Sequence, residues 1–206
     1  MNIRLKNLAK KYKNEVIFKG VDFSFDGPGK FGVIGNNGSG KSTLLKTICG
    51  STTHNKGDIY YTLNGENIPV DKWHLHFSLA APYMDVIEDF TPVELFHFQK
   101  KFKPFLKGID QNEFVNALNL PKQEDKFISS FSSGMKQRIR LVSAILADCP
   151  ILFLDEPCSN MDQNGVQWYQ DLLTKYASHK LVIIASNEQQ QELFNCSESL
   201  DIRAFK

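Results

Sequence analysis

Hydrophobic and polar positions alternate in the first part of the chain. The stretches "NIRL" and "VDFSF" place every second side chain on an apolar face. Such alternation predicts strands with one face buried and the other in water. The stretch "GDIYYTLNGENI" alternates in the same way and contains Asn64-Gly65, a pair typical of tight hairpin turns. An antiparallel β region is therefore expected.

Short apolar runs follow a different pattern. "FGVI", "PILFLD" and "KLVIIAS" have no polar face, which is typical of strands buried on both sides of a parallel sheet. The stretches "KSTLLKTIC" and "GVQWYQDLLTKYA" have helical spacing. Residues 88–145 also follow a helical pattern, and this segment is too long for a simple crossover. We expect an α/β fold with a mainly parallel core sheet and a helical lobe. The last 15 or so residues are expected to form a short helix and a strand.

Composition narrows the class of protein. The 206 residues are 42% hydrophobic and 23% charged, and the net charge is +1, so we expect no nucleic-acid partner. The N-terminus lacks the apolar segment of a signal peptide, and no run of about 18 apolar residues could span a membrane. The four cysteines have no C-x-x-C spacing and are expected to be reduced.

The strongest chemical motif is "GNNGSGKS", which fits the pattern G-x-x-x-x-G-K-[ST] between a predicted strand and a predicted helix. Backbone N–H groups of such a loop surround phosphate oxygens, and the positive end of the helix faces the same anion. The alternative is a glycine-rich turn without a ligand. The predicted nucleotide-binding residues are Gly35, Asn36, Asn37, Gly38, Ser39, Gly40, Lys41, Ser42 and Thr43.

A second set of polar residues ends the strand "ILFLDEP". Asp155 could hold a Mg²⁺ ion together with Ser42, and Glu156 could polarise an attacking water. Lys41 would contact the β and γ phosphates. The alternative is a solvated acidic pair, and it is less attractive when a phosphate loop lies on a neighbouring strand.

Small residues also precede a helix predicted to begin near Met135. Ser132, Ser133 and Gly134 could bind an anion at that helix start, although an ordinary helix cap is the better explanation when these residues are taken alone. One compact nucleotide site hardly needs two such helix starts. The helix starts at the phosphate loop and at Ser132–Gly134 could therefore belong to a site that two molecules share. This interpretation needs the support of a further pattern.

Taken together, these motifs resemble the ATP-binding subunit of ABC transporters over nearly the whole chain. Walker A corresponds to residues 35–43, Walker B to residues 151–156, the signature to "FSSGMKQR" and the D-loop to "CSNMD". The resemblance implies a P-loop NTPase fold of ABC ATPase type, with an antiparallel β subdomain and a helical subdomain at about 88–145. It implies one such domain over residues 1–206, with ATP and Mg²⁺ as ligands.

The resemblance also implies partners. The family works as a head-to-tail nucleotide-sandwich dimer, so Ser132, Ser133 and Gly134 would face the ATP of a like subunit, in a homodimer or a heterodimer. A separate transmembrane permease subunit would complete the transporter, and the chain would be cytoplasmic and peripheral on the inner face of the cell membrane. Tyr12 matches an aromatic residue that stacks on adenine, or else it packs on its strand neighbours.

Three departures from the family pattern stand out. The signature "LSGGQ" is "FSSGM" here, and no glutamine occupies the Q-loop position at Ala81 or Pro82, so coupling is expected to depend on Pro82, Tyr83 and their neighbours. Asn187 stands where the family has its switch histidine, and it cannot carry a positive charge. With Glu156 and Lys41 present as catalytic residues, we expect a slow ATPase.

Two alternatives remain open at this point. The chain could be a soluble ATP-dependent clamp or remodelling factor, or a regulatory pseudo-ATPase that binds ATP without turnover. Eight of the 16 phenylalanines lie between Phe90 and Phe131. They would form the core of the helical lobe, or some of them would line a groove for a helix of a membrane partner.

Overall fold

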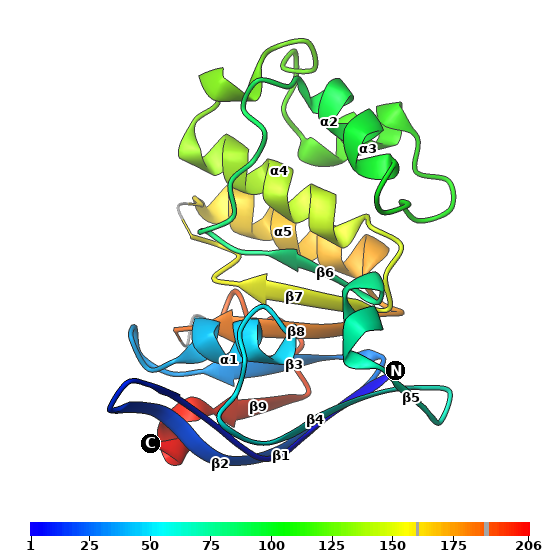
Figure 1. Cartoon of the computed structure of the whole chain (residues 1–206). Coiled ribbons are helices and arrows are strands. Elements are labelled where there is room, and N and C mark those ends of the chain that lie inside the picture. Colours follow the sequence, from blue (N-terminus) through cyan, green and yellow to red (C-terminus); the bar gives the residue numbers. More distant parts are fainter. Residues whose placement is uncertain (160, 188–189) are drawn as a thin grey trace.

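Two β-sheets with helices between and above them make up the computed structural model, which describes residues 1–159, 161–187 and 190–206 (Figure 1). The antiparallel sheet has the order β2-β1-β4-β5, and the parallel sheet has the order β6-β7-β8-β3-β9. The first sheet comprises β1 (Asn2–Tyr12), β2 (Glu15–Asp26), β4 (Lys56–Leu63) and β5 (Glu66–Ile68), and the second comprises β3 (Gly29–Ile34), β6 (Phe77–Ala80), β7 (Ile151–Asp155), β8 (Leu181–Ser186) and β9 (Glu198–Asp201).

Helices cover both faces of the parallel sheet. The helix α1 lies between the two sheets, whereas α4 and α5 pack on the opposite face and α2 and α3 lie beyond them (Figure 1). Short 3₁₀ helices complete the chain. The α-helices are α1 (Lys41–Ile48), α2 (Pro92–Lys100), α3 (Gln111–Leu118), α4 (Ser133–Ile145) and α5 (Gln163–Tyr176), and the 3₁₀ helices are η1 (Val70–Leu75), η2 (Ile128–Ser130) and η3 (Ile202–Phe205).

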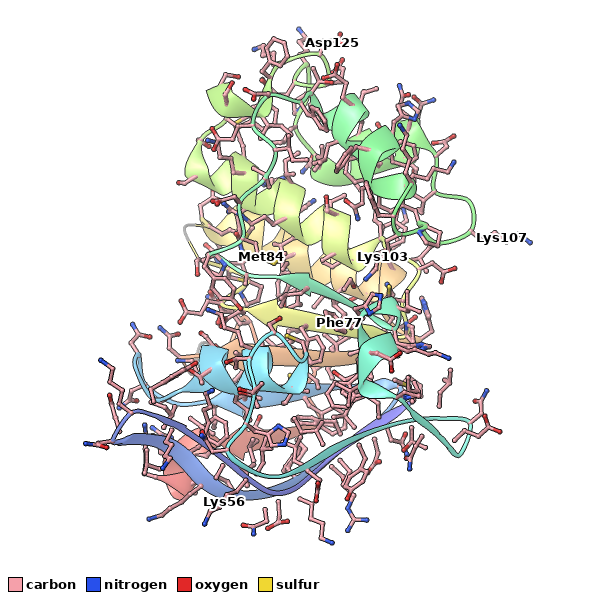
Figure 2. The ribbon with its side chains drawn as sticks, in the orientation of Figure 1. Lys56, Phe77, Met84, Lys103, Lys107 and Asp125 are labelled. Atoms are coloured by element: carbon pink, nitrogen blue, oxygen red, sulfur yellow. The ribbon has the colours of Figure 1, made fainter. Side chains whose placement is uncertain are left out.

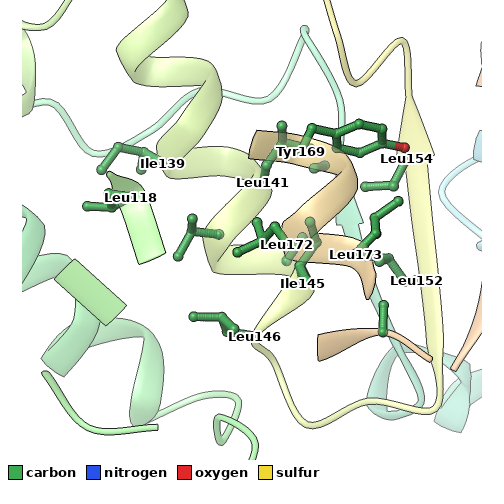
Figure 3. Packing of buried hydrophobic residues seen from close by; sticks show 14 of the residues in the cluster. Leu118, Ile139, Leu141, Ile145, Leu146, Leu152, Leu154, Tyr169, Leu172 and Leu173 are labelled. Atoms are coloured by element: carbon green, nitrogen blue, oxygen red, sulfur yellow. The ribbon is translucent and has the colours of Figure 1, made fainter. Parts of the chain in front are cut away.

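The alternating directions of side chains along β7 divide the interior into two cores. Ile151 and Phe153 join the core that surrounds α1, whereas Leu152 and Leu154 face α4 and α5. Figure 3 shows this second core, in which Tyr169 of α5 packs near Leu154. A strand buried on both faces needs apolar side chains at every position, which explains the uninterrupted apolar run.

The structure confirms the α/β fold class with its parallel and antiparallel sheets. Several sequence expectations are wrong in detail. The strand β6 was not expected, because four residues are too few to give a clear pattern. The helix α4 starts at Ser133, two positions before Met135, because Ser132 caps it there. Within residues 190–206 the expected strand is confirmed as β9, but turns precede it and the 3₁₀ helix η3 follows it, so no α-helix forms in this described segment.

Across the described ranges, the helices are all too short or too polar to cross a bilayer.

Candidate nucleotide site

The carboxyl ends of three neighbouring parallel strands bring the predicted site together. In the strand register, Ile34 pairs with Ser186, and Asp155 pairs with Ala185. The same edge of the sheet therefore carries three segments: the phosphate loop after β3, Asn187 after β8 and Glu156 after β7. Because β8 lies between β3 and β7, Asn187 is in the middle. Ligands of open α/β sheets bind at this edge.

The phosphate loop wraps around the ammonium of Lys41. That ammonium donates to the carbonyls of Gly35 and Asn36, at 2.9 and 3.1 Å, and the side chain is buried. Gly40 has φ +104°, and a Cβ there would lie 2.7 Å from Cγ2 of Ile17. Both facts require glycine directly before α1. The loop backbone and the start of α1 have a geometry that suits an anion.

An open cavity of about 340 Å³ lies over this loop. Glu156 faces it with a side chain that is 35% exposed, and its Oε1 lies 4.0 Å from the ammonium of Lys41. Glu156 also has φ +44°, which is uncommon for a residue other than glycine and is typical of functional sites. The cavity is lined by Ile17, Asn37, Gly38, Gly40, Lys41, Ser42, Thr43 and Glu156.

Asp155 has the chemistry of a metal ligand. It is 1% exposed, and its two carboxylate oxygens have no hydrogen-bond partner among the described residues. Burial raises the pKa of Asp155, while the nearby Ser42 hydroxyl lowers it and Glu156 raises it further. Buried carboxylate oxygens without partners are costly unless a cation compensates them. The residues therefore fit a Mg²⁺ ion, which prefers oxygen ligands.

Two predicted residues, Asn187 and Tyr12, do not line the cavity. Asn187 is exposed directly after β8. Tyr12 is 47% exposed at the end of β1, and the ammonium of Lys10 lies 4.5 Å from its ring centroid. Tyr12 does not line the cavity, but it belongs to the same hairpin as Ile17, which contacts the phosphate loop at Gly40.

The three signature residues are outside this cavity. Ser132 caps α4 by accepting a hydrogen bond from the N–H of Met135, at 3.3 Å. Ser132 and Ser133 are exposed, and Gly134 is partly buried in the first turn of α4. The helix start is thus open to a ligand that the chain's own phosphate loop would not hold. Asn160 of the expected D-loop lies outside the described residues, whereas Asp162 caps α5.

An aromatic contact lies beside the position of the missing Q-loop glutamine, Ala81 or Pro82. Tyr83 follows β6, and the ammonium of Lys46 lies 3.7 Å from its ring centroid. Burial raises the pKa of the Tyr83 hydroxyl, and the charge of Asp155 adds to this rise, so Tyr83 lies within electrostatic reach of the Walker B aspartate. Lys46, in turn, lowers the pKa of Asp155.

Sequence reasoning missed three polar residues that support the site. Lys46 has no motif of its own, Gln137 lies in a helix, and Glu192 lies in the polar stretch "EQQQEL". Gln137 is buried and donates to the carbonyl of Pro157, at 3.1 Å, next to Glu156. Gln137 lies within the signature segment "FSSGMKQR", whereas the only signal for Lys46 and Glu192 was their polarity, which does not distinguish a buried group from a solvated one.

Comparisons with known proteins agree with this geometry. Residues 18–159 match the ABC transporter family. The chain is 27% identical over 202 residues to the uncharacterized ABC transporter ATP-binding protein YybJ of Bacillus subtilis (strain 168), covering 97% of this chain and 92% of that protein. It is 29% identical over 191 residues to the cytochrome c biogenesis ATP-binding export protein CcmA of Reclinomonas americana, covering 90% of this chain and 84% of that protein.

Solved structures share the fold. A putative ABC transporter ATP-binding protein from Pyrococcus furiosus superposes with a TM-score of 0.84 at 22% identity, with 100% of both chains covered. The dimeric post-hydrolysis structure of the ATP-binding cassette MJ0796 with ADP and Pi superposes with a TM-score of 0.81 at 20% identity. The superposition covers 98% of this chain and 95% of that chain. These relatives do not favour the clamp alternative.

The family match covers well over half of the chain and includes the phosphate loop and the acidic strand end that form the cavity. The chain therefore belongs to the ABC transporter family, and it is an ATP-binding, ATP-hydrolysing subunit of that family.

Proposed function

We propose that this chain is a slow ATPase that powers a separate membrane permease, to which it binds on the cytoplasmic face. The observation that carries the proposal is the convergence of the phosphate loop, Asp155 and Glu156 at one edge of the parallel sheet. Residues 1–206 would act as one domain, with the helical lobe at 88–145 as its subdomain.

The proposed reaction is the attack of water on the γ phosphorus of ATP, which breaks the bond to the ADP oxygen. Glu156 would polarise this water and accept its proton, and Lys41 would stabilise charge on the β and γ phosphates. Asp155 and Ser42 would hold Mg²⁺, which supplies positive charge to the phosphates when it is bound. Tyr12 would stack on adenine.

Asn187 is the reason why we expect slow ATP hydrolysis. From its place between the phosphate loop and Glu156, its amide would donate a neutral hydrogen bond to the γ phosphate. A charge-assisted bond contributes roughly 1.5–3 kcal/mol against about 1 kcal/mol for a neutral one. Turnover would therefore be about an order of magnitude slower than with histidine.

A second ATPase subunit, identical or similar, would complete each site. The open helix start at Ser132, Ser133 and Gly134 has no role in the chain's own cavity, and it suits a phosphate presented by a partner. The similar MJ0796 structure is named as a dimer with ADP and Pi. We infer a nucleotide-sandwich dimer with two composite sites.

The groove beneath α2 is the proposed contact with the permease. It has a volume of about 320 Å³ and lies beside the loop after β6, where Met84 is found (Figure 2). A membrane partner would fill it with a short helix, because the apolar lining suits the apolar face of such a helix. The groove is lined by Leu79, Met84, Asp85, Val86, Ile87, Leu95, Phe98, Gln99, Phe102, Arg140 and Ser143.

Hydrogen bonds run from this groove to the ATP site. Arg140 donates to the carbonyl of Met84, at 2.6 Å, and to Oε1 of Gln137, at 3.2 Å. Gln137 donates to the carbonyl of Pro157 directly after Glu156. A helix that moves Met84 would therefore act on the segment that carries Glu156. The similar proteins CcmA of Reclinomonas americana and ZnuC of Wolbachia are named as export and import proteins, respectively.

The test combines turnover with assembly. Purified protein should hydrolyse ATP with Mg²⁺, and Lys41→Ala should abolish this activity because the loop loses its phosphate ligand. Glu156→Gln should bind ATP without hydrolysing it, so gel filtration with ATP should give a dimer that wild type does not accumulate. The double variant Lys41→Ala/Glu156→Gln is the matched control and should stay monomeric.

Two results would contradict the proposal. Turnover of wild type no higher than that of Lys41→Ala would remove the enzymatic role. A Glu156→Gln protein that binds ATP and remains monomeric would remove the composite site.

A further inference from the structure

Glu192 is a buried carboxylate to which the proposed reaction assigns no role. It is 1% exposed, and among the described residues only Asp155 is another buried acidic side chain. A buried carboxylate is costly unless hydrogen-bond donors surround it. Its partners therefore indicate what it does.

Both oxygens of Glu192 accept hydrogen bonds, from two different segments. Oε1 accepts from the backbone N–H of Cys158, at 3.0 Å, and Oε2 accepts from the hydroxyl of Ser186, at 2.5 Å. Its own backbone carbonyl accepts from the hydroxyl of Tyr169, at 3.3 Å. The preceding carbonyl, of Gln191, accepts from the side chain of Gln170 on α5, at 3.0 Å. The turn that carries Glu192 is thus anchored on α5 through its backbone, and the carboxylate joins the end of β8 to the loop after β7.

These two segments lead to the proposed reactive groups. Cys158 lies two positions after Glu156, and Ser186 directly precedes Asn187. Glu156 has a backbone conformation that needs support, with φ +44° and its N–H bonded to the carbonyl of Ala185, at 2.9 Å. A single carboxylate therefore fixes the end of β8 relative to the loop after β7.

We propose that Glu192 is a positioning residue of the ATPase, which holds Glu156 and Asn187 in register across the γ-phosphate position. This inference rests on the proposed function. Burial raises the pKa of Glu192, and the two donors lower it. Both donated hydrogen bonds require the side chain to accept, so a carboxylate suits the place better than an amide, whose nitrogen cannot accept either of them.

The test compares Glu192→Gln with the control Glu198→Gln, which alters an exposed carboxylate in β9. Glu192→Gln should lower kcat by about tenfold to a hundredfold, because the hydrogen bonds from Cys158 and Ser186 lose their charged acceptor. The Kd of a fluorescent ATP analogue should change by less than about twofold, because Lys41 and the phosphate loop are untouched. Glu192→Asp, which keeps the charge, should recover part of kcat. The control Glu198→Gln should have the kcat and the Kd of wild type.

Hydrogen exchange gives a readout that is independent of turnover. In Glu192→Gln the Cys158 amide should exchange about tenfold faster, while the β3 amides and the control variant stay unchanged. Unchanged exchange at Cys158 would overturn the inference, and so would faster exchange with an unchanged kcat. A fall in melting temperature without a fall in kcat would show a merely structural role.

The two proposals fail in different ways. If wild type has no turnover, the proposed function fails and the positioning role fails with it, even if exchange at Cys158 responds to Glu192→Gln. If wild type is active and Glu192→Gln is equally active, only the inference about Glu192 fails.

Discussion

At the scale of single residues, the site depends on side chains at the ends of adjacent strands. Asn187 is exposed one residue after β8, between the phosphate loop and Glu156. Its amide can donate a hydrogen bond but cannot become cationic, so the same place offers less stabilisation to the growing charge on phosphate than an imidazolium would.

Replacing this amide should change the rate. Asn187→His should raise kcat by about tenfold, because a charge-assisted bond replaces a neutral one. Steady-state ATPase assays with Mg²⁺ measure the effect. Lys41→Ala in the same background should remove the gain, which assigns it to this site. An equal or lower kcat for Asn187→His would mean that the site is built around asparagine.

At the scale of elements, α4 is held at both ends. Ser132 caps its N-terminus, and the ammonium of Lys180 donates to the carbonyls of Ile145 and Ala147 at its C-terminal end, at 2.8 and 2.5 Å. A cation at this end also complements the helix dipole. The helix that carries the signature is therefore fixed relative to β8, which begins one residue after Lys180.

The buried ammonium predicts a pH dependence of stability. Burial lowers the pKa of Lys180 from 10.5 to about 8, so between these values the unfolded chain binds more protons than the folded one. The contribution of Lys180 to the free energy of unfolding should therefore rise with pH across this window. Denaturant unfolding at pH 7.5 and pH 10 should show less of this rise in Lys180→Met.

The control for this comparison is Lys107→Met, since Lys107 lies on an exposed loop (Figure 2). Its pH dependence should equal that of wild type. Equal pH dependence in all three proteins would contradict the assignment to Lys180.

At the scale of the whole molecule, the aromatic residues of the helical lobe fall into two groups. Phe96, Phe105 and Phe114 pack together in the core. Phe98 and Phe102 line the groove instead, and Phe102 is 74% exposed. The core interpretation is therefore confirmed for Phe96, Phe105 and Phe114, whereas a groove that receives a helix of a membrane partner stays a prediction. Apolar side chains that gather at the surface, as Phe98 and Phe102 do in this groove, are typical of a protein contact.

The groove predicts how the chain reaches a membrane. In its native cells, the wild-type chain should sediment with membranes, and Phe102→Asp should shift most of it to the supernatant because a charge replaces the apolar contact. The control Phe127→Asp changes an exposed phenylalanine outside the groove and should sediment like wild type. ATPase activity of the purified Phe102→Asp protein should be unchanged. Membrane binding by Phe102→Asp at the wild-type level would contradict this docking site.

Local chemistry made much of the fold predictable. The phosphate loop, Asp155-Glu156 and the strand before Asn187 could be found because glycine spacing and apolar runs act over a few residues. The strand β6 could not, because its four residues pair only with β7, a strand distant in sequence. The contact of Tyr83 with Lys46 and the hydrogen bonds of Gln137 likewise join segments far apart in the chain.

The sequence by itself determined most of the core strands and helices, the phosphate loop and the acidic strand end, since these follow from periodicity and from the φ angles that glycine permits. Only the tertiary structure decided which polar side chains became buried partners. Glu192 shows this most clearly: its place between Cys158 and Ser186 arises from the packing of a turn on α5. Burial is a property of packing, and no pattern of residue types near Glu192 encodes it.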